Sequence, residues 1–342
     1  MSTLKPQLLV GVSAGINSIH TIIVRQEVEG KLRLMGEHRY RHVTQNRDEL
    51  QLVQRVKESI EQAIEDAQVK QEDILTIGVS SPGQIDIDNG AILYAPLFEV
   101  KKNPFPFIER MRDYFDVPHI TLINNDDAPG IAEQRIGEGK GIQHMVYLRL
   151  GYTIGAGIII DGKLYTGASN LAGTFGHMSV DRNGPECNCG NRGCLEALVS
   201  REAVAKQLQQ RYRNGEQTIL ADRLNRELPD INSAVLADAI DQEDDLTCKV
   251  IEEAAEVFGI GIANVINFLN PERVILGGDM NDEIDLFFEK AVESGWRRSL
   301  PASRNTVSIV RGRLRTTAGA YGAAVFAKEH LLKIQEQQAP ET

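Results

Sequence analysis

The sequence predicts an α/β protein built from two domains. Its 342 residues make a chain that is long for one hydrophobic core. In each half, three expected strands precede a series in which strands and helices alternate, and the first three lie at 8–12, 19–25 and 31–40. β-Branched or alternating residues between glycine-containing turns indicate these strands. The repeated order therefore predicts two α/β cores.

The first half continues with a helix at 47–67, where Leu50, Val53, Val56 and Ile60 recur at spacings of three and four residues. After it we expect a buried strand at 74–79, a hairpin at 85–95 around Asp88-Asn89-Gly90, a helix at 106–115 and a strand at 119–124.

The second half repeats the theme after residue 143. We expect strands at 144–150, 154–161 and 163–166, a charged helical region at 198–245, a long helix at 246–269, a strand at 273–278, a helix at 281–298, a strand at 305–311 and a terminal helix at 316–334. The polar tail from Ile334 to Thr342 is expected to be disordered.

Composition describes an ordinary globular protein, with 42% hydrophobic and 25% charged residues. The formal net charge of −11 argues against direct contact with nucleic acid, whose phosphates need a basic surface. No apolar run is long enough to cross a membrane, and no signal peptide is visible. Three clustered cysteines and the distant Cys248 suit a reducing compartment better than disulfides. We therefore expect a cytoplasmic protein.

A group of metal-binding residue types lies in the second half. His177 precedes Cys187, Cys189 and Cys194, and one imidazole with three thiolates is a common closed set for structural zinc. Gly190 and Gly193 allow the backbone to turn tightly between the cysteines. Buried cysteines can also act simply as small apolar residues, but this clustering favours zinc. With four protein ligands, no position stays open for a catalytic water.

The same segment carries a family resemblance. Gly176-His177, nine residues, and then Cys187-x-Cys189-Gly-x-x-Gly-Cys194-Leu-Glu resemble the zinc motif of the ROK family of repressors, unassigned reading frames and sugar kinases. The stretch 150–168 is similar to that family's signature segment, and the similarity runs from about residue 8 to 330.

The resemblance implies the two-domain sugar kinase/actin-like ATPase fold, which is ribonuclease H-like. In that fold the last helix returns to the first domain, so the expected domains are 1–124 with 318–342, and 125–317 with the zinc motif. The resemblance also implies a sugar as ligand, ATP and Mg²⁺ if the protein is active, and a homodimer or homotetramer.

The first two catalytic motifs of the family are altered here. The phosphate loop Asp-x-Gly-Gly-Thr becomes Ser13-Ala14-Gly15-Ile16-Asn17, which keeps only Gly15. The general base of the family is the Asp of an Asn-Asp pair, and a gapless alignment puts Asn124 and Asn125 there. An amide accepts no proton at neutral pH, whereas a shift by one residue would place Asp126 as the base. Asp126 and Asp127 also fit the simpler role of acids at a helix N-terminus.

The second phosphate loop and the adenosine-side turn keep their glycines better. The loop of the family resembles Gly151-Tyr-Thr153-Ile-Gly155-Ala-Gly157, in which Thr153 takes a glycine position. The turn Gly277-Gly278 matches the family and is followed by Asp279. Close packing of strands also explains such glycines, so their presence indicates the fold more than a nucleotide.

The implied sugar pocket is mixed. His177 and Glu196 match the family pattern, and Asn124 and Asn125 are further candidate contacts. Thr174 replaces a glutamate, and Leu97 replaces an asparagine. Each lost polar partner costs a ligand about 1–3 kcal/mol.

Two functions from different classes follow. The first is a ROK homologue impaired in phosphoryl transfer that acts as a carbohydrate-binding or regulatory protein. The second is an active ATP-dependent kinase of hexoses or N-acetylhexosamines that uses Asp126 as base. A ROK repressor would need a helix-turn-helix before the core, and the first strand starts near residue 7.

Overall fold

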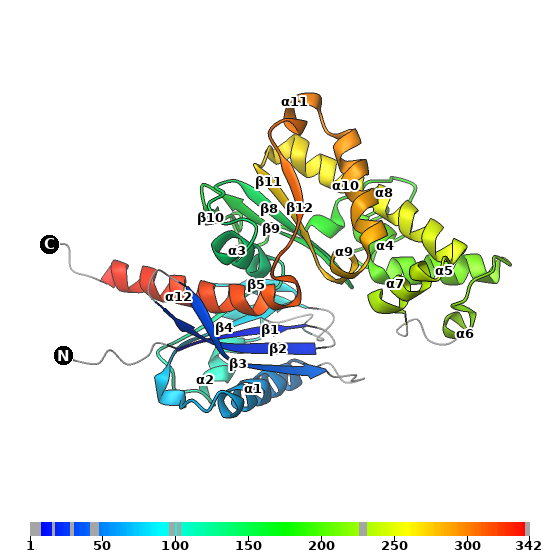
Figure 1. The fold of residues 1–342 in the computed structure, drawn as a ribbon. Coiled ribbons are helices and arrows are strands. Elements are labelled where there is room, and N and C mark those ends of the chain that lie inside the picture. The colour runs from blue at the N-terminus through cyan, green and yellow to red at the C-terminus, as the bar shows by residue number, and fades with distance from the viewer. Residues whose placement is uncertain are drawn as a thin grey trace. The chain divides into compact units, whose positions relative to one another are not determined.

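The computed structural model describes residues 8–15, 18–27, 31–41, 48–95, 100, 104–225 and 231–338. By packing, the chain forms two compact units. The first comprises residues 1–133, 164–172 and 317–342, and the second comprises residues 134–163 and 173–316. Each unit contains one five-stranded mixed sheet (Figure 1).

The first sheet has the order β3-β2-β1-β4-β7. β1 pairs antiparallel with β2, and β2 pairs antiparallel with β3, whereas β1, β4 and β7 run parallel. The strands are β1 (Leu8–Ala14), β2 (Ser18–Gln26), β3 (Leu32–Arg41), β4 (Ile74–Ser81) and β7 (His119–Asn124). β5 (Gln84–Asp86) and β6 (Ala91–Tyr94) form a separate hairpin. The parallel strands are buried on both faces, which explains their continuous apolar runs.

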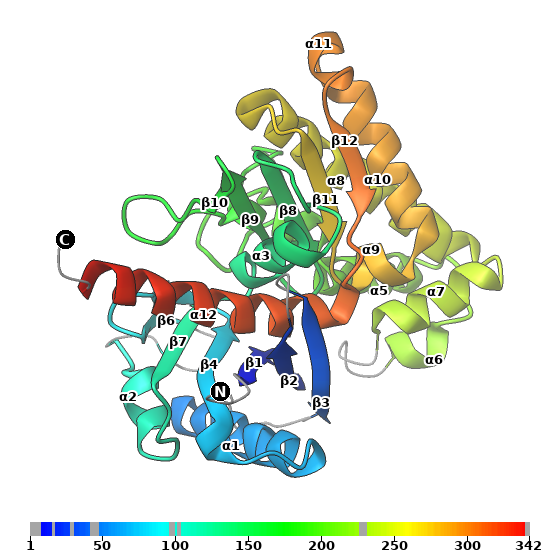
Figure 2. The ribbon, with the colours of Figure 1, turned by 60° about the vertical axis from the view of Figure 1, so that its left-hand side comes forward.

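Helices cover both faces of the first sheet. α12 (Ala318–Gln338) lies along one face and α1 (Glu49–Asp66) along the other, as Figures 1 and 2 show. α2 (Phe107–Arg112) joins the α1 side, and α3 (Asp127–Ile136) packs with α12. α1 starts at Asp48, whose carboxylate accepts a hydrogen bond from the backbone nitrogen of Gln51 at 2.8 Å.

Glycine allows α12 to approach its neighbours within the first unit. A Cβ added at Gly11 of β1 or Gly78 of β4 would overlap backbone atoms of α12. A Cβ at Gly322 of α12 would overlap the carbonyl oxygen of Ala128 in α3. The small residues of α12 are therefore required by backbone-to-backbone packing.

The second sheet repeats this plan with the order β10-β9-β8-β11-β12. β8 pairs antiparallel with β9, and β8, β11 and β12 run parallel. Its strands are β8 (Met145–Leu150), β9 (Ile154–Ile160), β10 (Lys163–Leu164), β11 (Arg273–Gly277) and β12 (Ser308–Arg311).

Helices of the second unit pack against this sheet through one apolar core. α8 and α10 are the longest of them and pack against each other (Figure 1). The helices are α4 (Leu195–Val199), α5 (Arg201–Arg213), α6 (Ala221–Leu224), α7 (Ser233–Asp241), α8 (Asp245–Leu269), α9 (Asp279–Glu283), α10 (Asp285–Arg298) and α11 (Pro301–Arg304).

The structure differs from the sequence expectations at three places. The helix expected at 281–298 is two helices, because Ile284 between α9 and α10 has an extended backbone. The strand expected at 305–311 is only β12, since α11 and a turn precede it. The expectation of disorder from Ile334 was wrong as far as Gln338, because α12 continues to that residue.

The grouping into units differs from the boundary expected after residue 124. That boundary placed the following helix in the second domain. In the structure, Ala128 and Ile131 of α3 pack with Ile123 and with Ala323 of α12. Most of α3 therefore belongs to the first unit by its apolar contacts.

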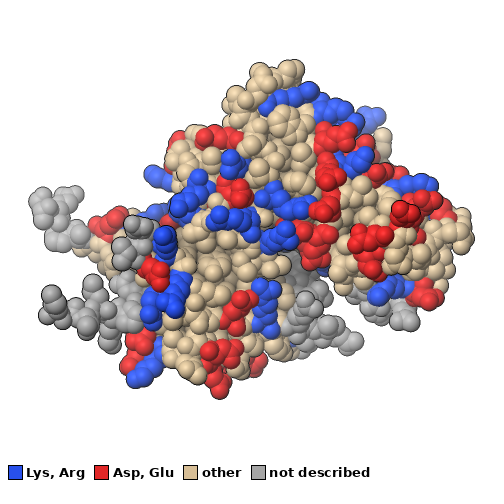
Figure 3. Space-filling model, viewed as in Figure 1, with Lys and Arg blue, Asp and Glu red and all other residues tan. Residues whose placement is uncertain are grey.

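The surface carries charges of both signs. On the face shown in Figure 3, basic and acidic side chains lie interspersed. Within the part of the chain that the structure describes, no helix combines the length and the apolar character that a membrane span requires.

The packing of α12 can be tested at Gly322. We expect Gly322→Ala to lower the free energy of unfolding by at least about 1–3 kcal/mol, because the added methyl group overpacks the contact with Ala128. Urea unfolding followed by circular dichroism measures this. Gln335→Ala, an exposed change in the same helix, is the control and should have little effect. Equal stability of both variants would contradict the close packing.

Candidate functional site

Short-range backbone geometry brings the four predicted zinc ligands together in the second unit. His177 ends a short 3-10 helix at Phe175–His177, and the cysteines lie in the turn that follows. The backbone nitrogen of Cys187 donates to Asn191 O at 2.8 Å, and that of Gly190 donates to Cys187 O at 2.9 Å. Gly190 and Gly193 have φ of 88° and 65°, a region that glycine adopts without strain. These turns hold the ligands in one cluster.

The donor atoms fit a tetrahedral metal. The imidazole nitrogen and three sulfurs lie within 4.8 Å of one another. Cys189 Sγ and Cys194 Sγ are 3.6 Å apart, and Cys187 Sγ lies 3.5 Å from His177 Nδ1. Zinc with Zn–S bonds of about 2.3 Å would separate two sulfurs by about 3.8 Å. His177, Cys187, Cys189 and Cys194 would thus hold zinc, which would supply structural rather than catalytic chemistry.

Glu196 links this cluster to the glycine-rich loop. It lies in α4, directly after the last cysteine, and its Oε2 accepts a hydrogen bond from Ile154 N at 2.9 Å. A Cβ at Gly176 would lie 2.6 Å from Ile154 O, so the backbone beside His177 also packs against this strand end. The backbone oxygen of Thr174 accepts from His177 N at 3.2 Å. The carboxylate of Glu196 therefore accepts at least one hydrogen bond from within the protein.

Only one of the predicted phosphate-loop glycines lies in the β8–β9 turn. Gly155 and Gly157 are in β9, in register with Arg149 and Tyr147 of β8. Gly151 begins the turn, where its nitrogen donates to Thr153 O at 3.2 Å. Arg149 Nη2 donates to Thr153 Oγ1 at 2.9 Å. The side chain of Thr153, which takes a glycine position of the family, is thus hydrogen-bonded within the protein.

The turn Gly277-Gly278 serves close packing against β8. A Cβ at Gly277 would overlap the Tyr147 hydroxyl, and one at Gly278 would overlap Leu150 O. Gly278 also has a φ of 90°. Asp279 follows and forms an ion pair with Arg201 at the start of α5.

The remaining candidates lie in the first unit, where β1, β4 and β7 end. Asn125 N donates to Ser81 O at 3.1 Å, and Asn125 Nδ2 donates to Ala14 O at 2.9 Å. Asn125 therefore bonds to the ends of both β4 and β1. The carboxyl ends of parallel strands are where ligands bind in open α/β sheets.

Asn124 and Asp126 form a local turn. Asn124 Nδ2 donates to Gly83 O at 2.6 Å, and Asn124 Oδ1 accepts from Asp126 N at 2.7 Å. Asp127 begins α3 and is buried, and burial together with the nearby Asp126 raises its pKa well above the usual range. Asp126 is only partly buried.

The first loop keeps a turn at Gly15, whose nitrogen donates to Ser18 O at 2.7 Å. Ser13 lies in β1 near α12, since a Cβ at Gly319 would be 2.5 Å from Ser13 Oγ. The predictions about Ile16 and Leu97 concern positions outside the described residues. Gly15, Asn124, Asn125 and Asp126 thus group in one unit, and the other candidates group in the second unit.

The grouping of charged side chains around the second loop was not predicted from the sequence. Arg149, Arg201 and Asp279 are neighbours there, and Asp282 lies in the same short helix as Asp279. An arginine at the end of a strand and an acid directly after two glycines were visible in the sequence. Their pairing, over 78 residues of chain in the case of Arg201 and Asp279, was not.

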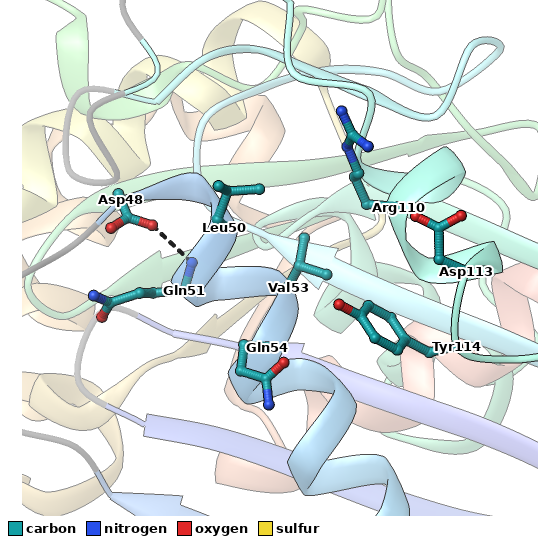
Figure 4. A pocket seen from close by; sticks show the side chains of 8 residues that line it. All are labelled: Asp48, Leu50, Gln51, Val53, Gln54, Arg110, Asp113 and Tyr114. Atoms are coloured by element: carbon teal, nitrogen blue, oxygen red, sulfur yellow. Dashed lines mark hydrogen bonds between the residues drawn. The ribbon is translucent and has the colours of Figure 1, made fainter.

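A pocket lies between α1 and α2 of the first unit (Figure 4). Leu50 and Val53 from α1 face Arg110 and Tyr114 from the α2 region across it. None of the predicted site residues lines it.

Two mixed sheets of the same order, with glycine turns and polar side chains at strand ends, define the class of protein as the two-sheet sugar kinase fold. The family model described as "ROK family" matches residues 9–330 of this chain. The chain belongs to the ROK family.

Relatives in this family include a kinase and a repressor. A glucokinase of Thermotoga maritima is 31% identical over 255 residues, which are 75% of this chain and 80% of the relative. A xylose repressor of Caldicellulosiruptor bescii is 29% identical over 331 residues, which are 96% of this chain and 80% of the relative. A ROK family glucokinase from Streptomyces griseus, solved with glucose and AMPPNP, superposes with a TM-score of 0.81 at 25% identity, covering 94% of this chain and 99% of that one.

The zinc prediction is tested by metal analysis. We expect one zinc ion per chain, and Cys189→Ser should release it and lower the melting temperature, because a structural metal adds its binding free energy to folding. Cys248→Ser, outside the cluster, is the control and should retain the metal. Metal-free protein with an unchanged melting temperature would contradict the assignment.

Asp282 should make the stability of the second unit depend on pH. Burial raises its pKa to about 7, although Arg315 and Arg311 oppose the shift. The folded state then keeps a proton that the unfolded chain loses near pH 4, so stability falls as pH rises from about 4 to 7, by at most about 4 kcal/mol. Asp282→Asn should remove this fall.

Trp296, the single tryptophan, lies in α10 of the second unit and reports its unfolding. Urea titrations followed by its fluorescence at pH 5 and pH 8 measure the effect. The exposed Asp241→Asn in α7 is the control and should keep the pH dependence of the wild type. A wild type equally stable at both pH values would refute the buried, protonated carboxyl.

Proposed function

We propose that this chain is a ROK-family sugar-kinase homologue that binds a carbohydrate and is impaired in phosphoryl transfer. Its role would be that of a carbohydrate-binding or regulatory protein. The observation that carries the proposal is the amide at position 125, at the shared end of β1, β4 and β7.

The amide at this position has a structural use. Asn125 Nδ2 donates to Ala14 O, and a carboxylate at the same place would set two acceptors against each other. Asn125 Oδ1 is buried and has no partner among the described residues, so it is a candidate acceptor for a ligand hydroxyl. An amide can bind and orient a hydroxyl group, but it cannot remove its proton.

The carbohydrate is supported by the family and by the remaining polar groups. In the first unit, Asn124, Asn125 and Asp126 would offer polar groups to a carbohydrate. Within the second unit, the candidate contacts are Thr174, His177 and Glu196. The Streptomyces griseus relative was solved with glucose, which supports a hexose or a hexose derivative as the ligand class.

The second candidate is an active ATP-dependent sugar kinase with Asp126 as its base. It is favoured by the glucokinase from Thermotoga maritima and by the carboxyl of Asp126 directly beside Asn125. ATP and Mg²⁺ would then be cofactors, with Gly151, Gly277 and Gly278 as candidate nucleotide contacts within the second unit. The expectations of a homo-oligomer and of no direct contact with nucleic acid stay predictions.

Catalysis and binding can be separated experimentally. We expect calorimetry to detect a ligand among hexoses and N-acetylhexosamines, whereas the same sugars with ATP and Mg²⁺ give no sugar-dependent ADP release. A positioned base contributes typically about 10²–10⁴-fold, so its loss alone removes most turnover. Asn125→Asp should not restore activity, because its carboxylate would face Ala14 O.

The alternative has a distinct outcome. If Asp126 is the base, the wild type releases ADP with a sugar, and Asp126→Asn abolishes the release. Asp127→Asn is the matched control, since the buried Asp127 has a raised pKa and an amide resembles its protonated form. Turnover that is lost in Asp126→Asn and kept in Asp127→Asn would refute the proposed function.

A further inference from the structure

The turn after β8 is filled by charged side chains of its own unit. Asp279 Oδ1 would lie 2.7 Å from a Cβ built on Gly151, and Arg149 Nη1 would lie 4.0 Å from it. Arg201 pairs with the other carboxylate oxygen of Asp279, and Arg201 N donates to Gly151 O at 3.0 Å. One carboxylate and two guanidinium groups thus meet at this glycine.

This carboxylate has the surroundings of a bound anion. Burial raises the pKa of Asp279, whereas the charges of Arg201 and Arg149 lower it. Met280 N also donates to Asp279 Oδ1, at 3.1 Å. Backbone N–H groups and guanidinium groups around a glycine are the donors that proteins use for carboxylate and phosphate oxygens alike.

The absence of a side chain at Gly151 leaves space for the carboxylate of Asp279. A Cβ at position 151 would lie 2.7 Å from Asp279 Oδ1, so a side chain there would have to displace the carboxylate even without a ligand. Arg149 is held in place by its bond to Thr153 Oγ1, at the position where the resembling loops have glycine. The charged side chains and the loop form one internally bonded arrangement.

We propose that the Asp279 carboxylate is a built-in anion that occupies the place of a phosphate group at Gly151 and so excludes nucleotide phosphates from this loop. This inference rests on the proposed function, because it supplies a reason for weak nucleotide binding. Removing the carboxylate leaves Arg149 and Arg201 without their counter-charge, and that exposed positive pair selects phosphate.

The experiment compares ADP and inorganic phosphate binding, by calorimetry, to the full-length wild type and to Asp279→Ala. We expect the wild type to bind ADP more weakly than about 1 mM. Asp279→Ala should bind ADP and phosphate at least tenfold more tightly. The double variant Asp279→Ala with Arg201→Ala should lose most of this gain, since it has the space but not the cation.

Retained zinc and an unchanged tryptophan spectrum show that the second unit stays folded in each variant. If Asp279→Ala loses the metal, Asp279→Asn replaces it, because the amide keeps the shape and removes the charge. The Asp279→Asn variant should still bind phosphate at least threefold more tightly than the wild type. Folded variants with no gain overturn the inference alone. Micromolar ADP binding by the wild type overturns this inference, whereas sugar-dependent ADP release by the wild type overturns the proposed function.

Discussion

The hydrogen bond from the Asn125 amide to Ala14 O is the contact on which the functional reading depends. Ala14 ends β1 and Asn125 follows β7, with the end of β4 between them. Backbone groups at strand ends have no ladder partner, so a buried carbonyl there needs a donor. The amide supplies it, and under the gapless alignment that we propose the same choice removes a carboxylate from the base position. The backbone at Ala14 requires a hydrogen-bond donor at position 125, whereas proton abstraction would require a carboxylate there.

A similar pattern recurs in the second unit. Glu196 bonds to Ile154 N, Arg149 bonds to Thr153, and Asp279 pairs with Arg201. These three side chains lie at, or next to, positions where the family resemblance implies a ligand. Each of them already has a hydrogen-bonding or ionic partner within the protein. A ligand that displaced such bonds would have to replace them, because an unpaired buried polar group costs about 1–3 kcal/mol. Internal pairing of these polar groups would therefore weaken the binding of any ligand that had to displace them.

Much of the fold could be predicted from the sequence, because buried strands and amphipathic helices repeat with regular periods. The predicted succession of strands and helices along both halves was confirmed in outline, and so was the family. The break at Ile284 was not predictable, since α9 and α10 together have the length and apolar content of one helix. The continuation of α12 was missed because polarity was taken as a sign of disorder, although residues such as Gln335 and Glu336 are good helix formers.

The site was predictable only where its residues are close in sequence. The His/Cys cluster predicted to bind zinc spans 177–194, so its residues are close in sequence as well as in space. Asn125 could be named from the alignment, but its bond to Ala14 crosses 111 residues. The pair of Arg201 and Asp279 likewise forms only after β8, α5 and α9 have packed together. Long-range polar pairs leave no period in the sequence, which is why pattern analysis found the glycines and missed the charges beside them.

The surviving glycines carry less functional information than the altered polar residues. Gly277 and Gly278 have no room for a side chain because of Tyr147 and Leu150, whereas a side chain at Gly151 would have to displace the Asp279 carboxylate. Loss of any of them would strain the unit whether or not a nucleotide binds. A polar residue at a strand end is constrained by its hydrogen bonds rather than by lack of space, as Asn125 is by Ala14 O. Retained glycines beside altered polar positions are thus the pattern expected when a kinase scaffold is kept for binding rather than for phosphoryl transfer.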